Sequence, residues 1–268
     1  MDPRDPAVPV LLRQGRLDIT GRLVVASNAT LFGMLSADGV ELRCVYKPVR
    51  GERPLWDFPD GTLAGREVAS YLVSEAAGWH VVPPTVLREG PFGPGMVQVW
   101  VDTDDERELV DVRAVTDVPP GWLGVLRARD GRGEPAVLVH ADLPELRAMA
   151  AFDVVVNNAD RKGGHVLAGL DGGIYGVDHG LCLHVEHKLR TVLWGWIGRP
   201  VTPEVLEALR RLQCGLTESG RGALRDELTE HITRREIKAL QTRVDTLLAE
   251  PCYPEPSGYG PAIPWPAF

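Results

Sequence analysis

Residues 157–167, NNADRKGGHVL, and residues 174–180, IYGVDHG, are the two stretches that decide the predicted fold. The first places Asp160 in a polar loop, directly after a helix predicted over about residues 143–157. The second ends an apolar strand at Asp178, with a glycine two residues later. Phosphoryl transfer needs one carboxylate to orient the acceptor hydroxyl and a second to hold Mg²⁺ against the phosphates. Together the stretches predict a phosphotransferase site, although Asp160 alone is also typical of a turn or a helix cap.

A lysine that pairs with the phosphates, and is itself held by a helix glutamate, completes such a site. Residues 17–49 alternate in the manner of an antiparallel β-meander, and Lys47 ends its last strand before a proline. Residues 62–77 have the apolar spacing of a helix, and a glycine stop signal follows them. Glu67 on this helix is the predicted partner of Lys47, and Glu75 is the alternative.

The predicted elements divide the chain into three parts. Strands near 85–88 and 96–101 complete a β-rich segment over residues 1–101. Residues 102–250 begin with an acidic connector, continue irregularly to about 135, and are then predicted to be mainly helical apart from the two aspartate loops and short strands between them. Residues 251–268 form a tail rich in proline and aromatic residues, which either packs along the surface or is a disordered ligand-like stretch.

These motifs resemble the protein-kinase-like superfamily, especially its phosphatidylinositol 3- and 4-kinase branch and the HipA-like toxin kinases. In the lipid-kinase branch an Asp-Arg-x-x-x-Asn loop precedes an Asp-x-Gly motif. Residues 160–165, DRKGGH, and 178–180, DHG, match this pattern except that His165 replaces the asparagine. Residues 193–196, LWGW, are similar to the segment after the metal aspartate in type II phosphatidylinositol 4-kinases. The chain is also similar to an actinobacterial family with such a domain, over roughly residues 20–200.

The resemblance implies an α+β fold of two lobes, a β-rich N-lobe with one helix and a helical C-lobe, with the active cleft between them. It also implies ATP and Mg²⁺ as cofactors. Asp160 would orient or receive the acceptor proton, Asp178 would coordinate Mg²⁺, and Lys47 would contact the phosphates while pairing with Glu67.

Further nucleotide contacts follow from the same resemblance. Ser27, Asn28 and Thr30 occupy the place of the phosphate-covering loop, although the glycine-rich motif of protein kinases is missing. Gln98, Val99 and Trp100 would form the hinge that offers backbone groups to adenine.

His165 is the main departure from the pattern. A neutral imidazole can ligate a metal but suits softer ions than Mg²⁺. The replacement would weaken magnesium binding, favour Mn²⁺, or mark a degraded enzyme.

The favoured hypothesis is a kinase that transfers the γ-phosphate of ATP to a hydroxyl of a lipid headgroup, a protein serine or threonine, or a small molecule. Autophosphorylation is included. The alternative is a nucleotide-binding scaffold with little or no activity. A third, weaker hypothesis is a metalloprotein built on His179, His184 and His187, with His165 nearby, but their spacing matches no common zinc pattern.

Composition narrows the partners and the compartment. The net charge of −8 disfavours a nucleic-acid partner, because binding to phosphate backbones needs a basic surface. No apolar run approaches the roughly 20 residues needed to cross a bilayer. The four cysteines are scattered, which indicates neither a zinc knuckle nor a redox dithiol. The first residues do not have the pattern of a secretory signal. These features predict a cytoplasmic protein.

Overall fold

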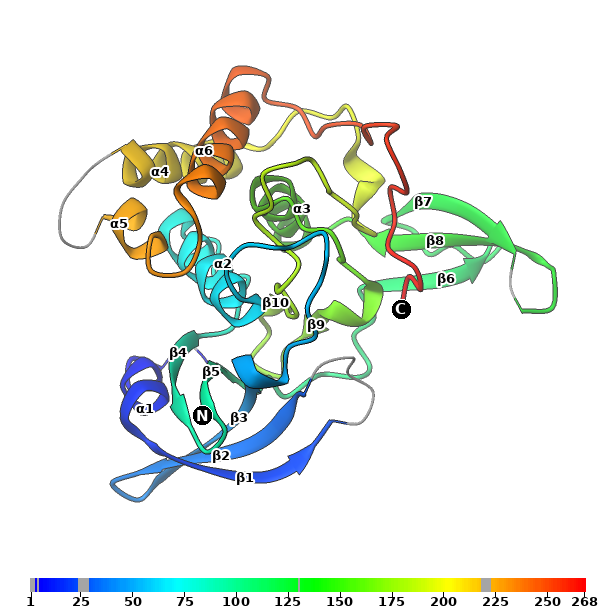
Figure 1. Cartoon of the computed structure of the whole chain (residues 1–268). Coiled ribbons are helices and arrows are strands. Elements are labelled where there is room, and N and C mark those ends of the chain that lie inside the picture. Colours follow the sequence, from blue (N-terminus) through cyan, green and yellow to red (C-terminus); the bar gives the residue numbers. More distant parts are fainter. Residues whose placement is uncertain (1–2, 4, 24–28, 130, 218–222) are drawn as a thin grey trace.

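The structure is a computed structural model that describes residues 3, 5–23, 29–129, 131–217 and 223–268. An antiparallel five-stranded sheet with strand order β1-β2-β3-β5-β4 lies beside a group of helices (Figure 1). The prediction of an α+β protein is confirmed. The strands of this sheet are β1 (Arg16–Arg22), β2 (Leu31–Ala37), β3 (Val40–Pro48), β4 (Thr85–Gly90) and β5 (Gly93–Val99).

Local sequence explains the central hairpin of the sheet. Asp38 and Gly39 connect β2 to β3, and both have positive φ, 51° and 78°. Two consecutive residues with positive φ form the type of tight turn that matches the twist of paired strands. β3 then alternates between buried and more exposed positions. Lys47 lies near the end of this strand, at one of the more exposed positions. A short helix that the sequence did not predict, α1 (Val8–Gln14), packs its buried apolar residues against the sheet.

Helix α2 (Leu63–Ala77) connects the sheet to the helical part of the molecule. The Thr62 side chain accepts a hydrogen bond from the backbone N–H of Gly65, so it caps the first turn. Gly78 ends the helix in the left-handed conformation, with φ of 72°. The prediction of a helix over 62–77 is confirmed to within one residue.

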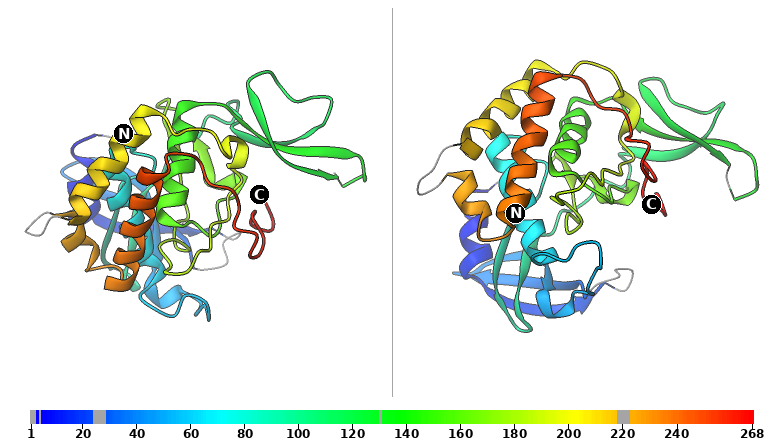
Figure 2. Two further views of the ribbon diagram at one scale, coloured as in Figure 1. Left: turned by 90° about the horizontal axis from the view of Figure 1, so that it is seen from above. Right: turned by 45° about the horizontal axis from the view of Figure 1, so that its top comes forward.

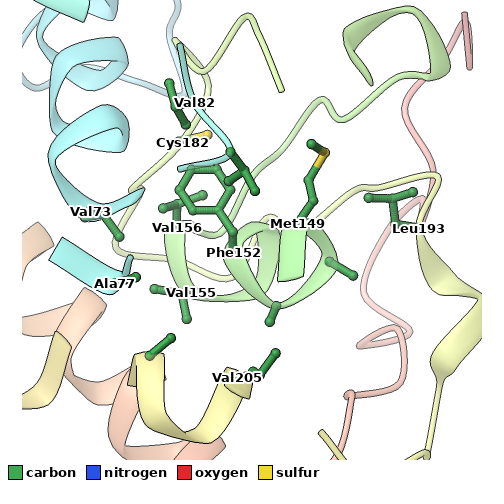
Figure 3. Packing of buried hydrophobic residues seen from close by; sticks show 14 of the residues in the cluster. Val73, Ala77, Val82, Met149, Phe152, Val155, Val156, Cys182, Leu193 and Val205 are labelled. Carbon is green, nitrogen blue, oxygen red and sulfur yellow. The ribbon is translucent and has the colours of Figure 1, made fainter. Parts of the chain in front are cut away.

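The remaining helices enclose the largest core. They are α3 (Pro144–Val156), α4 (Pro203–Thr217), α5 (Leu224–Leu228) and α6 (Arg234–Ala249). The right view of Figure 2 shows α4 and α6 side by side, with α3 next to them. Phe152 of α3 lies at the centre of this core, close to Val73 and Ala77 of α2 and to Val205 of α4 (Figure 3).

Two predictions about the segment after residue 101 are wrong. The stretch to about 135 that was expected to be irregular contains β6 (Val110–Ala114) and β7 (Trp122–Arg129). These strands form a three-stranded sheet with the next strand, β8 (Pro135–Ala141), in the order β6-β8-β7. This sheet projects from the rest of the molecule (Figures 1 and 2). Its two outer strands are largely exposed and carry charges, so the apolar alternation that signals a strand is weak.

The second wrong prediction is that residues after the second aspartate loop are mainly helical. Between β10 (Ile174–Gly176) and α4, a stretch that the structure describes throughout, the only helical turn is a 3₁₀ turn, Trp194–Trp196. Hydrogen bonds to side chains hold this stretch instead. The Asn157 side chain, for example, contacts the backbone of His184, Glu186 and Lys188.

The proline-rich tail packs on the helical part of the molecule. Tyr253 is buried, and its hydroxyl donates to the backbone oxygen of Arg147. The side chains of Tyr259 and Trp265 are more than nine-tenths exposed. None of the described helices combines the length and the apolar character required to cross a membrane.

Candidate functional site

Lys47 lies where the N-terminal sheet meets the helical part of the protein. Its Nζ is 2.6 Å from Glu67 Oε1 on α2 and 2.7 Å from Asp178 Oδ1 in the loop after β10. Burial by itself would lower the pKa of Lys47, but the negative charges of Asp178 and Glu67 outweigh burial and raise it. Lys47 is therefore a stable cation that joins the sheet, a helix and a loop.

Glu67 is buried and is held from two sides. Its Oε1 accepts from Lys47, and its Oε2 accepts a 2.9 Å hydrogen bond from the backbone N–H of His179. Burial raises the pKa of Glu67, and the charge of Lys47 opposes the rise. Glu75, the alternative partner, instead contacts His80 at the surface. The lysine thus meets Glu67 and not Glu75.

Asp178 follows strand β10 with φ of 63°, a conformation that residues other than glycine rarely adopt. Such a conformation persists where surrounding contacts fix it, and it is common at functional sites. The charge of Lys47 holds the pKa of Asp178 well below its usual range, although burial acts in the opposite direction. Asp178 is therefore an anion at neutral pH.

Asp160 lies beside this anion, in the loop that follows α3. The helix ends at Asn157, which has φ of 53°, and Asn158 Oδ1 accepts from the Asp160 N–H at 2.9 Å. Asparagine tolerates the left-handed conformation at the end of a helix. The two asparagines therefore help to determine where the helix ends and how the loop turns. Burial raises the pKa of Asp160, and Lys162, whose Nζ is 3.3 Å from Asp160 Oδ2, opposes the rise.

His165 completes the group, and its hydrogen bonds define its tautomer. Its Nδ1 is 3.0 Å from the backbone oxygen of Asp160, and a carbonyl oxygen can only accept. The hydrogen is therefore on Nδ1, and the lone pair is on Nε2, 3.6 Å from Asp178 Oδ2. Burial lowers the pKa of His165, which favours this neutral form. A neutral imidazole whose other nitrogen donates to a carbonyl is the usual form of a metal-binding histidine.

The three side chains fit a divalent cation. Ligand atoms of Asp160, His165 and Asp178 all lie within 4.8 Å of one another, and no other such group of three or more is found in the described part of the chain. Two carboxylates suit Mg²⁺ and Mn²⁺, and the imidazole nitrogen suits Mn²⁺ better than Mg²⁺.

The alternative cluster of histidines does not form among the described residues. His179 Nε2 is 2.7 Å from an Arg161 nitrogen, which can only donate. The Nδ1 of His184 accepts from the backbone N–H of Glu186. Among the described residues, no group of three or more potential metal ligands includes His179, His184 or His187.

Comparison with known proteins establishes the family. No family model matches the chain. Protein Rv2133c of Mycobacterium tuberculosis (strain ATCC 25618 / H37Rv) is 52% identical over 267 residues, which span 96% of this chain and 94% of the relative. The chain belongs to the Rv2133c family. That relative's name states no chemistry, so a function has to be inferred from the geometry of the site.

A solved structure with a similar arrangement is more distant. The crystal structure of the Helicobacter pylori proinflammatory kinase CtkA matches 88% of this chain and 97% of its own, with a TM-score of 0.41 and 10% identity. A likeness at this level establishes neither the fold nor the activity of the Rv2133c family.

A buried ion pair that the sequence did not predict supports both loops of this Rv2133c family member. Arg161 and Asp153 are fully buried, and the guanidinium contacts both carboxylate oxygens of Asp153. Asp153 also accepts from Asn158 and Thr191. Arg161 further contacts His179, which adjoins Asp178. The sequence does contain one indication of this pair. Asp153 lies on the apolar face of a predicted helix, and a charged residue is rarely buried there unless it is paired.

The predicted nucleotide contacts have mixed positions. Ser27 and Asn28 lie outside the described residues. Thr30 is buried just before β2, and its carbonyl accepts from the Leu23 N–H.

The predicted hinge segment uses several of its polar groups within the protein. The Gln98 side chain donates to Thr85 Oγ1. The backbone N–H groups of Val99 and Trp100 donate to the carbonyls of Pro84 and Arg43, both at 3.0 Å. An adenine contact at this segment stays a prediction. Because these two N–H groups are already bonded, adenine would have to bind carbonyl groups of the segment or the next residue, Val101.

Proposed function

We propose that this protein is an ATP-dependent phosphotransferase that transfers the γ-phosphate to a hydroxyl acceptor with the help of a divalent cation. The observation that supports this best is the convergence of Lys47, Glu67 and Asp178, with Asp160 alongside. Kinases of the protein-kinase-like superfamily place a lysine of the third strand against a helix glutamate, and set a metal aspartate and a catalytic-loop aspartate nearby.

The same correspondence extends the proposal to the fold. The five-stranded sheet with α2 takes the place of the N-lobe, and α3 to α6 take the place of the C-lobe. The nucleotide would then bind where Lys47 meets Asp178, with residues 27–30 near its phosphates and residues 98–100 near adenine.

Lys47 would contact the phosphates, and Glu67 would hold it in position. Because Glu67 is bonded to Lys47 and to the His179 N–H, it links the phosphate contact to the loop of Asp178. This arrangement would fix the positive charge of Lys47 beside the phosphates before the reaction begins. Such positioning of charge is the main contribution that proteins make to phosphoryl transfer.

Asp160 would accept the proton of the acceptor hydroxyl as the acceptor oxygen bonds to the γ-phosphorus and the bond to the β-phosphate oxygen breaks, releasing ADP. Burial raises the pKa of this carboxyl, and a base whose pKa lies nearer the working pH is more effective. Asp178 and His165 would hold the cation, which when bound neutralises phosphate charge.

The test is γ-phosphate transfer with labelled ATP and Mg²⁺ or Mn²⁺, measured both as autophosphorylation and as release of phosphate to water. We expect Asp160→Ala to lower the rate by roughly 10²- to 10⁴-fold, because it removes the proton acceptor. Asp117→Ala is the matched control, since Asp117 is 77% exposed on the β6–β7 connection. Full activity in Asp160→Ala would refute the assignment of Asp160.

The second candidate is a nucleotide-binding scaffold, and His165 is the observation that favours it, because an asparagine stands at this position in the motif that the loop resembles. Tight nucleotide binding by the wild-type protein, with no transfer in either Mg²⁺ or Mn²⁺, would support the scaffold over the kinase.

A further inference from the structure

The tail segment, residues 262–268, lies on the Asp160 loop and on residues 191–194. The carbonyl oxygen of Ala267 accepts a 2.7 Å hydrogen bond from the N–H of Gly163, midway between Asp160 and His165. The carbonyl oxygen of Ala262 accepts from the Thr191 N–H at 3.1 Å and from the Trp194 ring N–H at 2.9 Å. Figure 1 shows this end of the tail running past the sheet β6–β8 toward β9 (Val166–Ala168), where the loop ends.

Side-chain packing adds to these hydrogen bonds. The Phe268 ring covers Gly163 so closely that a Cβ at position 163 would overlap the ring. The φ of Gly163 does not fall in the left-handed range, so its backbone alone would accept alanine. Close approach of the tail is therefore the reason why this position needs a glycine.

The Asp160 loop and residues 190–192 are also joined to each other at this point. The Arg161 N–H donates to the carbonyl of Arg190, and the Val192 N–H donates to the carbonyl of Arg161, both at 3.1 Å. The tail thus contacts both of these paired segments, the one that carries Asp160 and His165 through Ala267 and the one that carries Thr191 through Ala262.

We propose that residues 262–268 are a positioning element of the candidate site, which fixes the Asp160–His165 loop through Ala267 and Phe268. The neighbouring Tyr259 and Trp265 side chains are almost fully exposed, so these contacts are particular to the residues that face the loop. The effect on loop geometry is independent of the proposed activity, while its catalytic consequence rests on that proposal.

A double-mutant cycle on Gly163→Ala and Phe268→Ala tests the contact, with hydrogen–deuterium exchange of peptides from residues 158–167 as the readout. We expect each single variant to exchange about tenfold faster than wild type, because each releases contacts of this loop. The double variant should exchange no faster than Phe268→Ala alone, since the added methyl then has no ring to meet. Tyr259→Ala is the control and should match wild type.

Conservative replacement and kinetics separate positioning from general loss of structure. Phe268→Tyr keeps the ring and should restore slow exchange of the loop, while peptides from α4 and α6 should be unchanged in all variants. If the protein transfers phosphate, Phe268→Ala should lower kcat and leave KM for ATP unchanged, because Lys47 and the sheet are untouched.

Loop exchange that is unchanged in Phe268→Ala, or a double variant whose effects simply add, would overturn the positioning role. The proposed kinase activity fails on a different observation, which is wild-type protein that neither binds nor turns over ATP while the exchange results hold.

Discussion

At the scale of single residues, His165 sets this site apart from the motif that its loop resembles. The Nδ1 hydrogen is bonded to the Asp160 carbonyl, which leaves Nε2 beside Asp178. A nitrogen ligand lowers the preference of a site for Mg²⁺ relative to Mn²⁺, because Mg²⁺ favours oxygen ligands.

We therefore expect His165→Asn to shift the ratio of Mn²⁺ to Mg²⁺ affinities toward Mg²⁺ by roughly tenfold. The measurement is an electron paramagnetic resonance titration of Mn²⁺, with Mg²⁺ as competitor, in the presence of a non-hydrolysable ATP analogue. His80→Asn is the matched control, because His80 is 59% exposed and contacts Glu75. An unchanged ratio in His165→Asn would contradict the role of Nε2 as a ligand.

Lys162 lowers the pKa of Asp160, and this predicts a change in pH dependence. Burial raises the pKa of Asp160 above 3.8, and Lys162 limits the rise. Asp160 accepts a proton only when ionised, so transfer should increase as the pH rises through its pKa. Lys162→Met removes the charge that lowers this pKa, and we expect the acid limb of kcat to move to higher pH. A limb that stays in place or moves to lower pH would disprove the assignment.

At the scale of elements, α2 is fixed to the helical part of the protein by the buried side chain of Arg66. This guanidinium contacts the carboxylate of Glu236 on α6 and the carbonyl of Cys182. At the other end of α2, Arg211 of α4 donates to the carbonyl of Ala77. Glu67 is thus presented to Lys47 from a helix that is held at both ends.

Removing one member of a buried ion pair leaves the other charge without a partner. We expect Arg66→Met to lower the free energy of unfolding by about 3–5 kcal/mol. Urea denaturation measures this change, and Arg210→Met on the exposed face of α4 is the control. Because the unpaired charge causes most of the loss, Glu236→Gln added to Arg66→Met should restore part of the stability. A loss below about 1 kcal/mol in Arg66→Met would show that the pair is not an anchor.

An element or a site residue could be predicted where the residues that indicate it are close together in the chain. Helix α2 was predicted because its apolar spacing and the glycine that follows it, Gly78, are close together in the chain. Asp160 and Asp178 were predicted because each lies in a short motif of adjacent residues. Arg66 and Glu236 are 170 positions apart, and nothing near either residue indicates the other. The contact of Phe268 with Gly163 was missed for the same reason.

At the scale of the whole molecule, the site joins elements that contribute to two hydrophobic cores. Cys44 is fully buried in the core of the N-terminal sheet, and Cys182 is fully buried in the helical core. Lys47 lies on β3, a strand of the sheet that contains the first core. Asp178 lies in the loop after β10, next to the second core. A ligand that contacts both residues should therefore stabilise both cores.

Thiol labelling measures this effect. In a variant with the exposed Cys214 and Cys252 changed to serine, we expect ATP with Mn²⁺ to slow the labelling of Cys44 and Cys182 together. Burial raises the pKa of Cys44 to about 12, so labelling reports the opening of the core rather than reactivity of the closed state. Protection of only one cysteine would show that the ligand contacts one core alone.

The bond between Lys47 and Asp178 has a consequence for the order of ligand binding. Asp178 already has a counter-ion, and an ammonium group 2.7 Å away repels any bare divalent ion that approaches the same carboxylate. A metal that arrives on a triphosphate brings the negative charge that draws this ammonium away. The protein should therefore discriminate against free metal and accept the metal–nucleotide complex as a single unit.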